Sequence, residues 1–323
     1  MTFDEIKHPV KQDITLFEST FKASMKTNIS MLDLITRYIV KRKGKQMRPL
    51  FVFLSAGLHG KTNDHTQRAA ALIELLHTAT LVHDDVVDDS NLRRGFFSIN
   101  ALWKNKAAVL VGDFLLSKGM LMALENKEYD LLEIVSYATK QMSEGELLQI
   151  EKARHLNITE DVYFDVIKMK TASLIASCCA AGAASVNAAE EQIVRMRTFG
   201  EYVGIAFQIR DDLFDFDSGN KSGKPVGGDI KEKKMTLPLI YTLKTMGSVE
   251  RKKTILAIKY NSTKKTTINS IISLVNNSGG IEYAEKKMNE YLDKALSLLD
   301  IYEESPYKEA LVALVKYSIN RKK

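Results

Sequence analysis

Apolar residues recur along most of the chain at the three- and four-residue spacing of amphipathic helices. The spacing is clearest in six stretches, which we predict to be helices: residues 64–85, 105–124, 129–150, 159–184, 188–216 and 236–245. The five prolines leave the span between Leu50 and Lys224 without a helix breaker. Hardly any stretch alternates with the period of two that is typical of strands. The pattern therefore predicts an all-α protein.

Helix ends and loops also have recognisable signals. Asp64 and Thr159 are predicted to be N-caps. Loops are predicted at 57–63, 91–98 and 218–228, and the last, with four glycines and a proline, is predicted to be a mobile lid. Residues 281–323 read as two helices divided near Ser305-Pro306. Because no long linker interrupts these elements, we expect one helical-bundle domain over residues 1–323, with a central active-site cavity.

Composition narrows the possible partners. Of the 323 residues, 45% are hydrophobic, which is ample for a packed core, and the net charge of +6 suits an anionic substrate or an acidic membrane surface. The basic residues are not interleaved with aromatic residues, which argues against nucleic acid. We find no secretory signal and no uninterrupted apolar run of membrane-spanning length. The adjacent Cys178 and Cys179 read as buried thiols in a reducing compartment, so a cytoplasmic location is expected.

Two acidic motifs carry the strongest chemical signal. Asp84-Asp85-x-x-Asp88 and Asp211-Asp212-x-x-Asp215 each follow an apolar helical stretch. Carboxylates four residues apart share a helix face and repel one another, so a compensating charge is expected. Mg²⁺ would supply it, because it binds carboxylates and takes substrate phosphates as further ligands. A single motif is typical of a solvated helix end, whereas the pair predicts a metal-bridged diphosphate site.

Such a site also needs fixed positive charge. Lys45 and Arg48 lie at a predicted helix start, where backbone N–H groups favour anions. Arg93 and Arg94 follow the first acidic motif, and their guanidinium groups match phosphate oxygens. Lys170-Thr171 and the lysines between residues 224 and 234 are further candidates.

The ordered motifs resemble those of the trans-type polyprenyl diphosphate synthases. They are Gly44-Lys45-x-x-Arg48-Pro49, Leu76-His77 before Asp84-Asp85-x-x-Asp88, Arg93-Arg94-Gly95, Gly112-Asp113, Lys170-Thr171, Gly204-x-x-Phe207-Gln208-x-x-Asp211-Asp212-x-x-Asp215, Gly223-Lys224 through Gly228-Asp229, and Lys234-Met235-Thr236-Leu237-Pro238. The resemblance implies the all-α isoprenoid synthase fold and a homodimer. It also implies a prenyltransferase of isoprenoid biosynthesis.

The resemblance implies a role for each motif residue. Asp84, Asp85 and Asp88, with Asp211 and Asp215, would hold Mg²⁺, three ions per active site with substrate bound, and Asp212 would assist them. The allylic diphosphate would contact Arg93, Lys170, Lys224 and Lys234. Isopentenyl diphosphate would contact Lys45, Arg48, His77 and Arg94, beside Phe207. The reacting carbons would be stabilised by Thr171 and Gln208.

These roles imply an ionisation–condensation–elimination mechanism. The allylic C–O bond breaks, the isopentenyl double bond attacks the resulting cation, and loss of a proton restores an alkene. The expected primer is farnesyl or geranylgeranyl diphosphate, and the product would serve a quinone side chain. Peripheral membrane contact would help a long product to leave.

Product length would depend on the residues one turn before the first acidic motif. Ala79 and Thr80 are small where short-chain members of the family carry aromatic residues. We therefore expect an open tunnel and a long all-trans product. A short-chain geranylgeranyl or farnesyl diphosphate synthase remains the alternative.

Three other readings are weaker. A class I terpene cyclase shares the first motif but normally carries an Asn/Asp–Ser/Thr–Glu pattern at its second metal site. A di-iron bundle needs Glu-x-x-His twice, and here only Glu74 and His77 match it. A silent subunit of a two-chain synthase tends to lose the acidic motifs, both of which are present.

Overall fold

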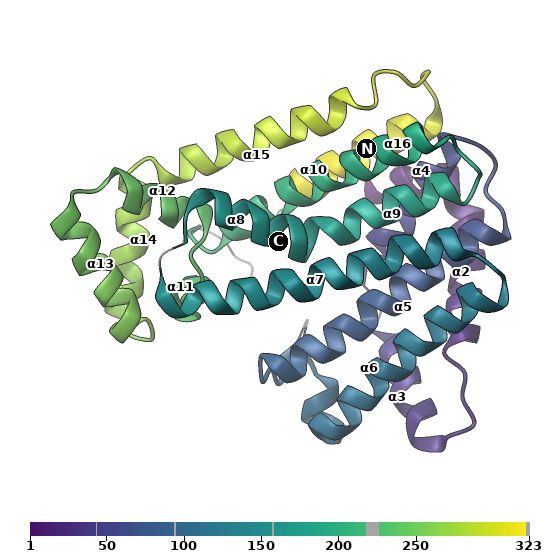
Figure 1. Ribbon diagram of the computed structural model, residues 1–323, viewed down its shortest axis with the longest axis horizontal. Helices are drawn as coiled ribbons and strands as arrows, with labels where there is room; N and C mark the ends of the chain where they lie inside the picture. Colours follow the sequence, from purple (N-terminus) through teal and green to yellow (C-terminus); the bar gives the residue numbers. More distant parts are fainter. Residues whose placement is uncertain (43, 94, 157, 218–225, 321–323) are drawn as a thin grey trace. The chain divides into compact units, whose positions relative to one another are not determined.

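The computed structural model describes residues 1–42, 44–93, 95–156, 158–217 and 226–320 (Figure 1). Its elements are helical apart from one two-stranded hairpin within these residues, which confirms the all-α prediction. The chain divides into two compact units, each built from separate segments of sequence. The long helices α7 (Tyr129–His155), α10 (Glu190–Phe214) and α16 (Pro306–Asn320) contribute residues to both units. The expectation of one domain stays a prediction.

The first unit comprises Met1–Thr139, Leu174–Arg197 and Tyr302–Ala313. Besides its parts of the shared helices, it contains α1 (Phe3–Lys7), η1 (His8–Val10), α2 (Lys11–Ser24), α3 (Ser30–Lys41), α4 (Met47–Gly57), α5 (Asp64–Val87), α6 (Ile99–Glu125), nearly all of α9 (Ser173–Ala184), and the strands β1 (Leu92–Arg93) and β2 (Phe96–Phe97). Helix α5 begins at residue 64 as predicted, but Asn63 and not Asp64 is its N-cap: the Asn63 side chain accepts from the Thr66 N–H at 3.0 Å.

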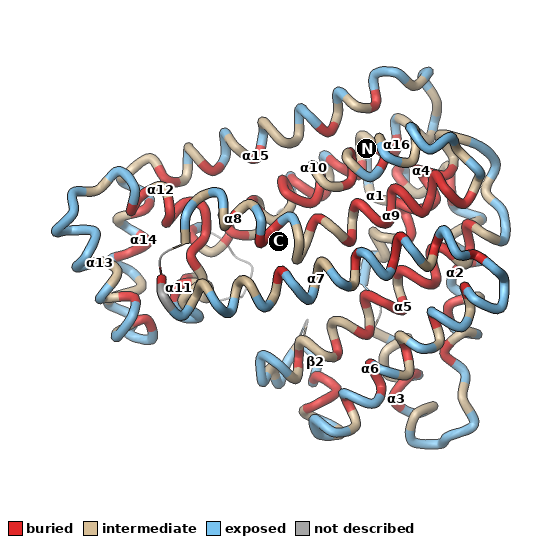
Figure 2. Tube along the Cα trace, in the orientation of Figure 1, coloured by how far each residue is buried: buried red, intermediate tan, exposed pale blue. Residues whose placement is uncertain are grey.

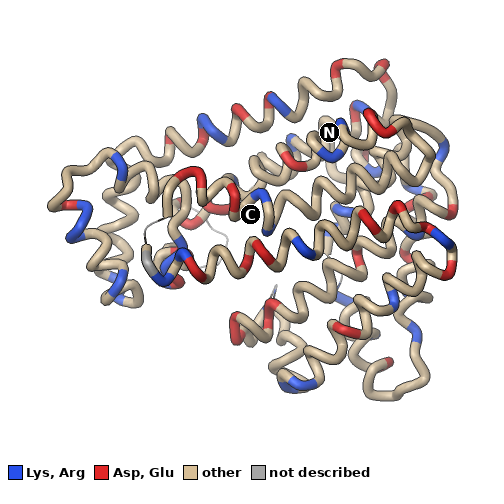
Figure 3. Tube along the Cα trace, viewed as in Figure 1, with Lys and Arg blue, Asp and Glu red and all other residues tan. Residues whose placement is uncertain are grey.

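Small residues let the central helices of the first unit pack closely. Helix α9 is buried along its length and carries no charged residue (Figures 2 and 3). Its Gly182 approaches α4 so closely that an added Cβ would lie 2.3 Å from the Val52 carbonyl oxygen. Helices α5 and α6 run side by side (Figure 1), and Gly112 and Gly119 of α6 face α5. Glycine at these contacts lets the neighbouring helix approach within the space that a Cβ would fill.

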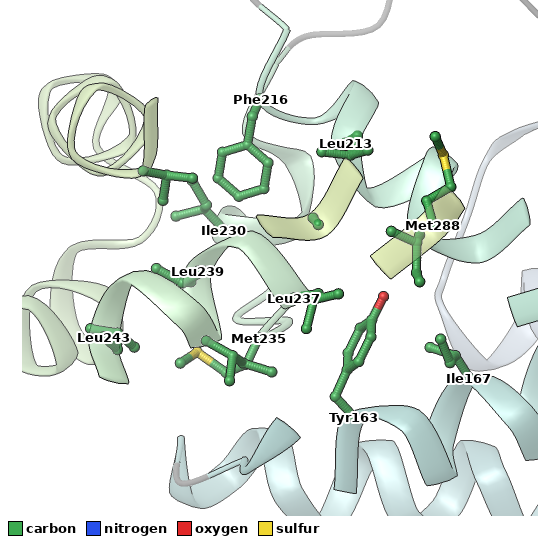
Figure 4. Close-up of a cluster of buried hydrophobic side chains, with 14 of the residues drawn as sticks. Tyr163, Ile167, Leu213, Phe216, Ile230, Met235, Leu237, Leu239, Leu243 and Met288 are labelled. Atoms are coloured by element: carbon green, nitrogen blue, oxygen red, sulfur yellow. The ribbon is translucent and has the colours of Figure 1, made fainter. Parts of the chain in front are cut away.

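The second unit comprises Lys140–Ser173, Thr198–Ile301 and Leu314–Lys323, described as far as residue 320. Its own elements are α8 (Glu160–Ile167), the π-helical turn η2 (Lys168–Ala172), α11 (Gly228–Lys231), α12 (Leu237–Thr245), α13 (Ser248–Asn261), α14 (Lys265–Asn277) and α15 (Gly280–Ser297). Thr159 caps α8 as predicted, through a 3.4 Å bond from the Val162 N–H. The core gathers apolar residues of α8, α10, α12 and α15, including Tyr163 (Figure 4).

Two helical stretches have the length and mean hydropathy of a membrane span, although charged residues interrupt the apolar sequence of both. They are α6 and the continuous run Glu160–Ala184. Core helices of soluble proteins pass the same test, and 67% of the apolar window in Glu160–Ala184 is buried within the protein. For α6 the buried share is 33%, so much of its apolar surface is exposed. Location and membrane contact stay predictions.

Candidate active site

The first acidic motif closes α5. Asp84 and Asp85 lie in its last turns, and Asp88 is the C-cap. Asp85 is only 3% exposed, and its Oδ1 accepts from Arg93 Nε at 2.8 Å and Nη2 at 2.7 Å. Asn100 donates to the Asp85 backbone carbonyl at 3.1 Å. Asp88 is exposed and Asp84 partly so, which leaves these two as the accessible carboxylates of the motif.

The hairpin after α5 positions Arg93. Strands β1 and β2 are antiparallel, with Arg93 opposite Phe96, and Gly95 adopts the positive φ of 79° that the turn requires. Tyr38 of α3 donates its hydroxyl to the Phe97 carbonyl at 2.6 Å. The Arg42 guanidinium stacks on the Tyr38 ring, 3.7 Å from its centroid. We predicted a plain loop here, and the two short strands were missed.

The predicted isopentenyl-binding residues that the structure describes belong to different elements of the first unit. Arg48 is partly buried in the first turn of α4, Lys45 is exposed just before this helix, and His77 is buried in α5. Arg94 lies outside the described residues. Of the chain-length residues, Ala79 is fully buried, and Thr80 donates its hydroxyl to the His77 carbonyl of its own helix at 3.0 Å.

The second acidic motif closes α10 and includes a buried hydrogen-bonded chain. Asp212 is 6% exposed. Its Oδ1 accepts from Gln208 Nε2 at 2.8 Å, and its Oδ2 accepts from the Tyr163 hydroxyl at 2.7 Å. Thr171 in turn donates its hydroxyl to Gln208 Oε1 at 2.8 Å. Three predicted site residues are thus connected to one another within the second unit.

Asp215 organises the start of α11. Its carboxylate accepts the backbone N–H groups of Gly228 at 2.8 Å and Asp229 at 3.0 Å, beside Gly227 with φ of 84°. Burial raises the pKa of Asp215, and these N–H groups act in the opposite direction. Asp211 is partly exposed. Lys224 and most of the predicted lid lie outside the described residues.

Carboxylates hold both described lysines of the predicted diphosphate site. Lys170 on η2 forms an ion pair with Glu146 of α7 and lies 3.4 Å from Gln149 Oε1. Lys234 forms an ion pair with Glu232. Glycines on two neighbouring helices allow η2 to be packed closely: an added Cβ would lie 2.8 Å from Lys170 N at Gly145 and 2.4 Å from Ala172 Cα at Gly204.

A cavity of about 120 Å³ in the second unit gathers these groups. It is lined by five predicted site residues, Lys170, Thr171, Gln208, Asp212 and Lys234, and by residues that we did not predict, including Gln149, Tyr163 and Asp229. Burial raises the pKa values of Asp212 and Asp229. The negative charge of Asp229 raises the pKa of Asp212 further, and that of Asp215 raises the pKa of Asp229 further. Phe207 does not line the cavity but packs partly buried against the apolar core.

Sequence reasoning missed Tyr163 and Glu146 for different reasons. Tyr163 lies seven residues before Lys170, two helical turns away, so helical periodicity could have indicated a shared face. The same spacing also fits an ordinary core tyrosine. Glu146 adjoins Gly145 in an acidic helix whose other carboxylates are solvated, so only its contact with Lys170 distinguishes it.

The accessible carboxylates of the acidic motifs suit a metal ion that takes its other ligands from water and substrate. Within the described residues, no group of three or more His, Cys, Asp or Glu side chains is arranged to hold a metal ion unaided. Mg²⁺ needs only one or two protein carboxylates when water and phosphate oxygens complete its shell. The accessible Asp84 and Asp88 and the partly exposed Asp211 offer oxygen ligands of that type.

Comparisons with known proteins give the family. Residues 29–275 match the family model described as "Polyprenyl synthetase". The chain is 37% identical over 319 residues to an all-trans-nonaprenyl-diphosphate synthase (geranyl-diphosphate specific) from Rhodobacter capsulatus, covering 98% of this chain and 97% of that protein.

Solved structures agree. A decaprenyl diphosphate synthase from Rhodobacter capsulatus superposes with a TM-score of 0.93 at 31% identity, covering 100% of both chains. A geranylgeranyl pyrophosphate synthase from Bacteroides thetaiotaomicron gives 0.84 at 37% identity, covering 98% of both chains. Members of this family are metal-dependent and join isopentenyl diphosphate to allylic diphosphates. The resemblance that the ordered motifs indicated is therefore confirmed: the chain belongs to the polyprenyl synthetase family and is a prenyltransferase.

Proposed function

We propose that this prenyltransferase adds isopentenyl diphosphate to farnesyl or geranylgeranyl diphosphate and releases a long all-trans polyprenyl diphosphate for a quinone side chain. The observation that carries the proposal is the cavity that brings together Lys170, Thr171, Gln208, Asp212 and Lys234. Two ammonium groups suit a departing diphosphate, while a hydroxyl and an amide suit a reaction whose intermediate is a carbocation. The ammonium groups and the neutral polar groups line the same small cavity.

We assign Mg²⁺ as the metal, three ions per active site, with Asp84, Asp88, Asp211 and Asp215 as its protein ligands. When bound, it supplies positive charge that stabilises the leaving diphosphate. Asp85 contributes by orienting Arg93, since its buried carboxylate accepts two hydrogen bonds from that guanidinium group. Besides binding the metal, the Asp215 carboxylate stabilises the start of α11 by accepting its first N–H groups.

The protein's own groups complete the reaction. Lys170 and Lys234 exchange their carboxylate partners Glu146 and Glu232 for diphosphate oxygens as the allylic C–O bond breaks. Thr171 and Gln208 supply oxygen lone pairs that stabilise the cation. Loss of a proton to the released diphosphate then restores the alkene.

Ala79 and the products named for the relatives support a long product. The nonaprenyl and decaprenyl synthases named above make long products, which supports the long-chain proposal. The geranylgeranyl pyrophosphate synthase is equally similar in sequence, and it keeps a short-chain product as the second candidate. Ala79 favours the first, because its methyl group leaves more room beside α5 than an aromatic ring would.

We also propose that the protein is a homodimer that pairs through α6. Leu110 is 61% exposed and Leu121 51%, on a long helix whose apolar window is only one-third buried. Val109, Met120 and Leu124 are exposed on the same helix. An apolar face of this extent is typical of a protein–protein interface. In a dimer with twofold symmetry, this face of each subunit would cover the same face of the other.

A product assay tests the proposed function. Purified protein is incubated with isopentenyl diphosphate, Mg²⁺ and dimethylallyl, geranyl, farnesyl or geranylgeranyl diphosphate, and the dephosphorylated products are sized by chromatography. We expect one long product of roughly six to ten units, about one helical turn of tunnel for each unit, and no product with EDTA. A product of three or four units would refute the long-chain assignment. A cyclic hydrocarbon, or no incorporation at all, would refute chain elongation.

A further inference from the structure

Tyr163 of α8 is buried in the core of the second unit, yet its polar end reaches the candidate site. Its side chain is 4% exposed, and its hydroxyl lies 2.7 Å from Asp212 Oδ2. Figure 4 shows its ring among the apolar side chains of this core, with the hydroxyl oxygen directed inward from α8. We propose that Tyr163 is a positioning residue that fixes the orientation of Gln208 and Thr171 through Asp212. This inference rests on the proposed function.

The hydrogen bonds of the chain can be assigned in only one direction. Gln208 donates its Nε2–H to Asp212 Oδ1, which leaves its carbonyl oxygen, an acceptor only, for the bond to Thr171. The Gln208 carbonyl oxygen is then turned to Thr171, which must donate its hydroxyl hydrogen. One carboxylate therefore sets the direction of every bond in the chain.

That direction decides which part of Thr171 faces the cavity. Because its hydrogen is donated to Gln208, the lone pairs of its oxygen are available to the cavity that Thr171 lines. Lone pairs stabilise a carbocation, whereas a hydroxyl hydrogen directed there would destabilise it. If the Gln208 amide turned over, its nitrogen would face Thr171 and the favourable orientation would be lost.

Tyr163 is the group that keeps Asp212 in place. The two carboxylate oxygens of Asp212 are held by two different donors, Gln208 on its own helix and Tyr163 on α8. Burial opposes a charge at this position, and both hydrogen bonds favour it. Without the tyrosine hydroxyl, Asp212 Oδ2 would be a buried oxygen without this donor, and rotation of the carboxyl group would release Gln208.

Tyr163→Phe tests the proposal, since it removes the hydroxyl and keeps the ring. We expect kcat to fall by about tenfold or more, the cost of one hydrogen bond to a charged group. The KM values of both diphosphates should change less than about twofold, because no predicted diphosphate ligand is altered. The matched control is Tyr291→Phe, a half-buried tyrosine of α15 that packs on Phe164 and Tyr202, for which kcat should be unchanged.

A double-mutant cycle separates positioning from a general loss of structure. Thr171→Val removes the other end of the chain, and if Tyr163 acts through it, the effects of Tyr163→Phe and Thr171→Val on kcat should be markedly less than additive. Additive effects, or a Tyr163→Phe enzyme with wild-type kcat, would overturn the proposal. A fall in kcat matched by an equal fall in folded protein, measured by thermal unfolding, would also overturn it. If the wild-type protein itself incorporates no isopentenyl diphosphate, the proposed function fails instead.

Discussion

The second aspartate of each acidic motif differs from its neighbours. Asp85 and Asp212 are both buried and both accept hydrogen bonds from the protein, from Arg93 in one motif and from Gln208 and Tyr163 in the other. Successive helix residues point about 100° apart, so in D-D-x-x-D the second carboxylate leaves the face that the first and third share. We predicted Asp85 as a metal ligand equal to Asp84. The structure pairs its carboxylate with Arg93, so the metal ligands that we propose in this motif are Asp84 and Asp88.

Ala79 is the residue at which product length should respond to mutation. It lies four residues from both Leu75 and His83, which face Gly119 and Gly112 of α6, so it belongs to the face of α5 that packs against α6. Ala79→Phe should fill the space there and shorten the product to about three or four units, since each turn of tunnel holds about one unit. Chromatography of the dephosphorylated products measures the change.

Thr80→Phe is the matched variant on the neighbouring face. If only Ala79→Phe shortens the product, the tunnel runs beside α6, and if only Thr80→Phe does, it follows the face that carries Asp84. Unchanged product length in both folded variants would contradict the chain-length role of both residues.

At the scale of elements, the π-helical turn η2 is the part of the second unit most dependent on its neighbours. It carries Lys170 and Thr171, and π-helical turns are frequent at functional sites. Gly145 of α7 and Gly204 of α10 each lie so close to the η2 backbone that a Cβ added at either position would clash with it. The packing of three segments therefore fixes two cavity-lining side chains.

Gly204→Ala should disturb this packing. Its Cβ would lie 2.4 Å from Ala172 Cα, and because backbone cannot move as a flexible side chain does, η2 must shift. We expect a loss of about 1–3 kcal/mol of stability by overpacking and a fall in kcat of tenfold or more, since displacement of catalytic groups by about 1 Å has large effects. Thermal unfolding and the product assay measure both. Gly247→Ala, with nothing within 4 Å of the added Cβ, is the control and should behave as wild type.

For the whole molecule, assembly is the first property to test. Leu110→Glu places a charge on the exposed apolar face of α6 and should convert the proposed homodimer to a monomer, because burying an unpaired carboxylate is costly. Light scattering after size-exclusion chromatography gives the mass. Tyr260→Glu, at a 70% exposed aromatic residue of α13, should leave the mass unchanged. A wild-type protein that is already monomeric would contradict the proposal.

Stability should also depend on pH through His59. Its Nδ1 lies 2.7 Å from the Ser55 carbonyl oxygen and its Nε2 2.9 Å from the Tyr302 hydroxyl, so the neutral ring satisfies both partners. Burial lowers the pKa of His59 below the ordinary 6.5, against the Ser55 hydrogen bond, which raises it. The unfolded chain therefore binds the proton more readily, and the stabilisation present above pH 6.5 is lost as the pH falls through the lowered pKa.

Melting temperatures between about pH 7.5 and 5.5 test this dependence. His59→Gln should lower the melting temperature at the upper end, by roughly one hydrogen bond or about 1 kcal/mol, and the difference from wild type should shrink at the lower end. His8→Gln, at an exposed histidine, should keep the wild-type profile. If the difference in melting temperature between His59→Gln and wild type stayed the same at every pH, His59 would not be the source of the pH dependence.

The sequence by itself determined the helical fold class, most helix positions, the two acidic motifs and the family, because these depend on local spacing: apolar residues every three or four positions, and carboxylates one turn apart. It also indicated which lysines and polar residues belong to one site, and five of them line one cavity. Tertiary structure alone decided which partner each charge has. The pairs Arg93–Asp85, Lys170–Glu146 and Tyr163–Asp212 join different segments, and no sequence spacing specifies such a pair. Buried charges and hydroxyls take the partner that packing brings within hydrogen-bond distance, and packing is a property of the folded chain.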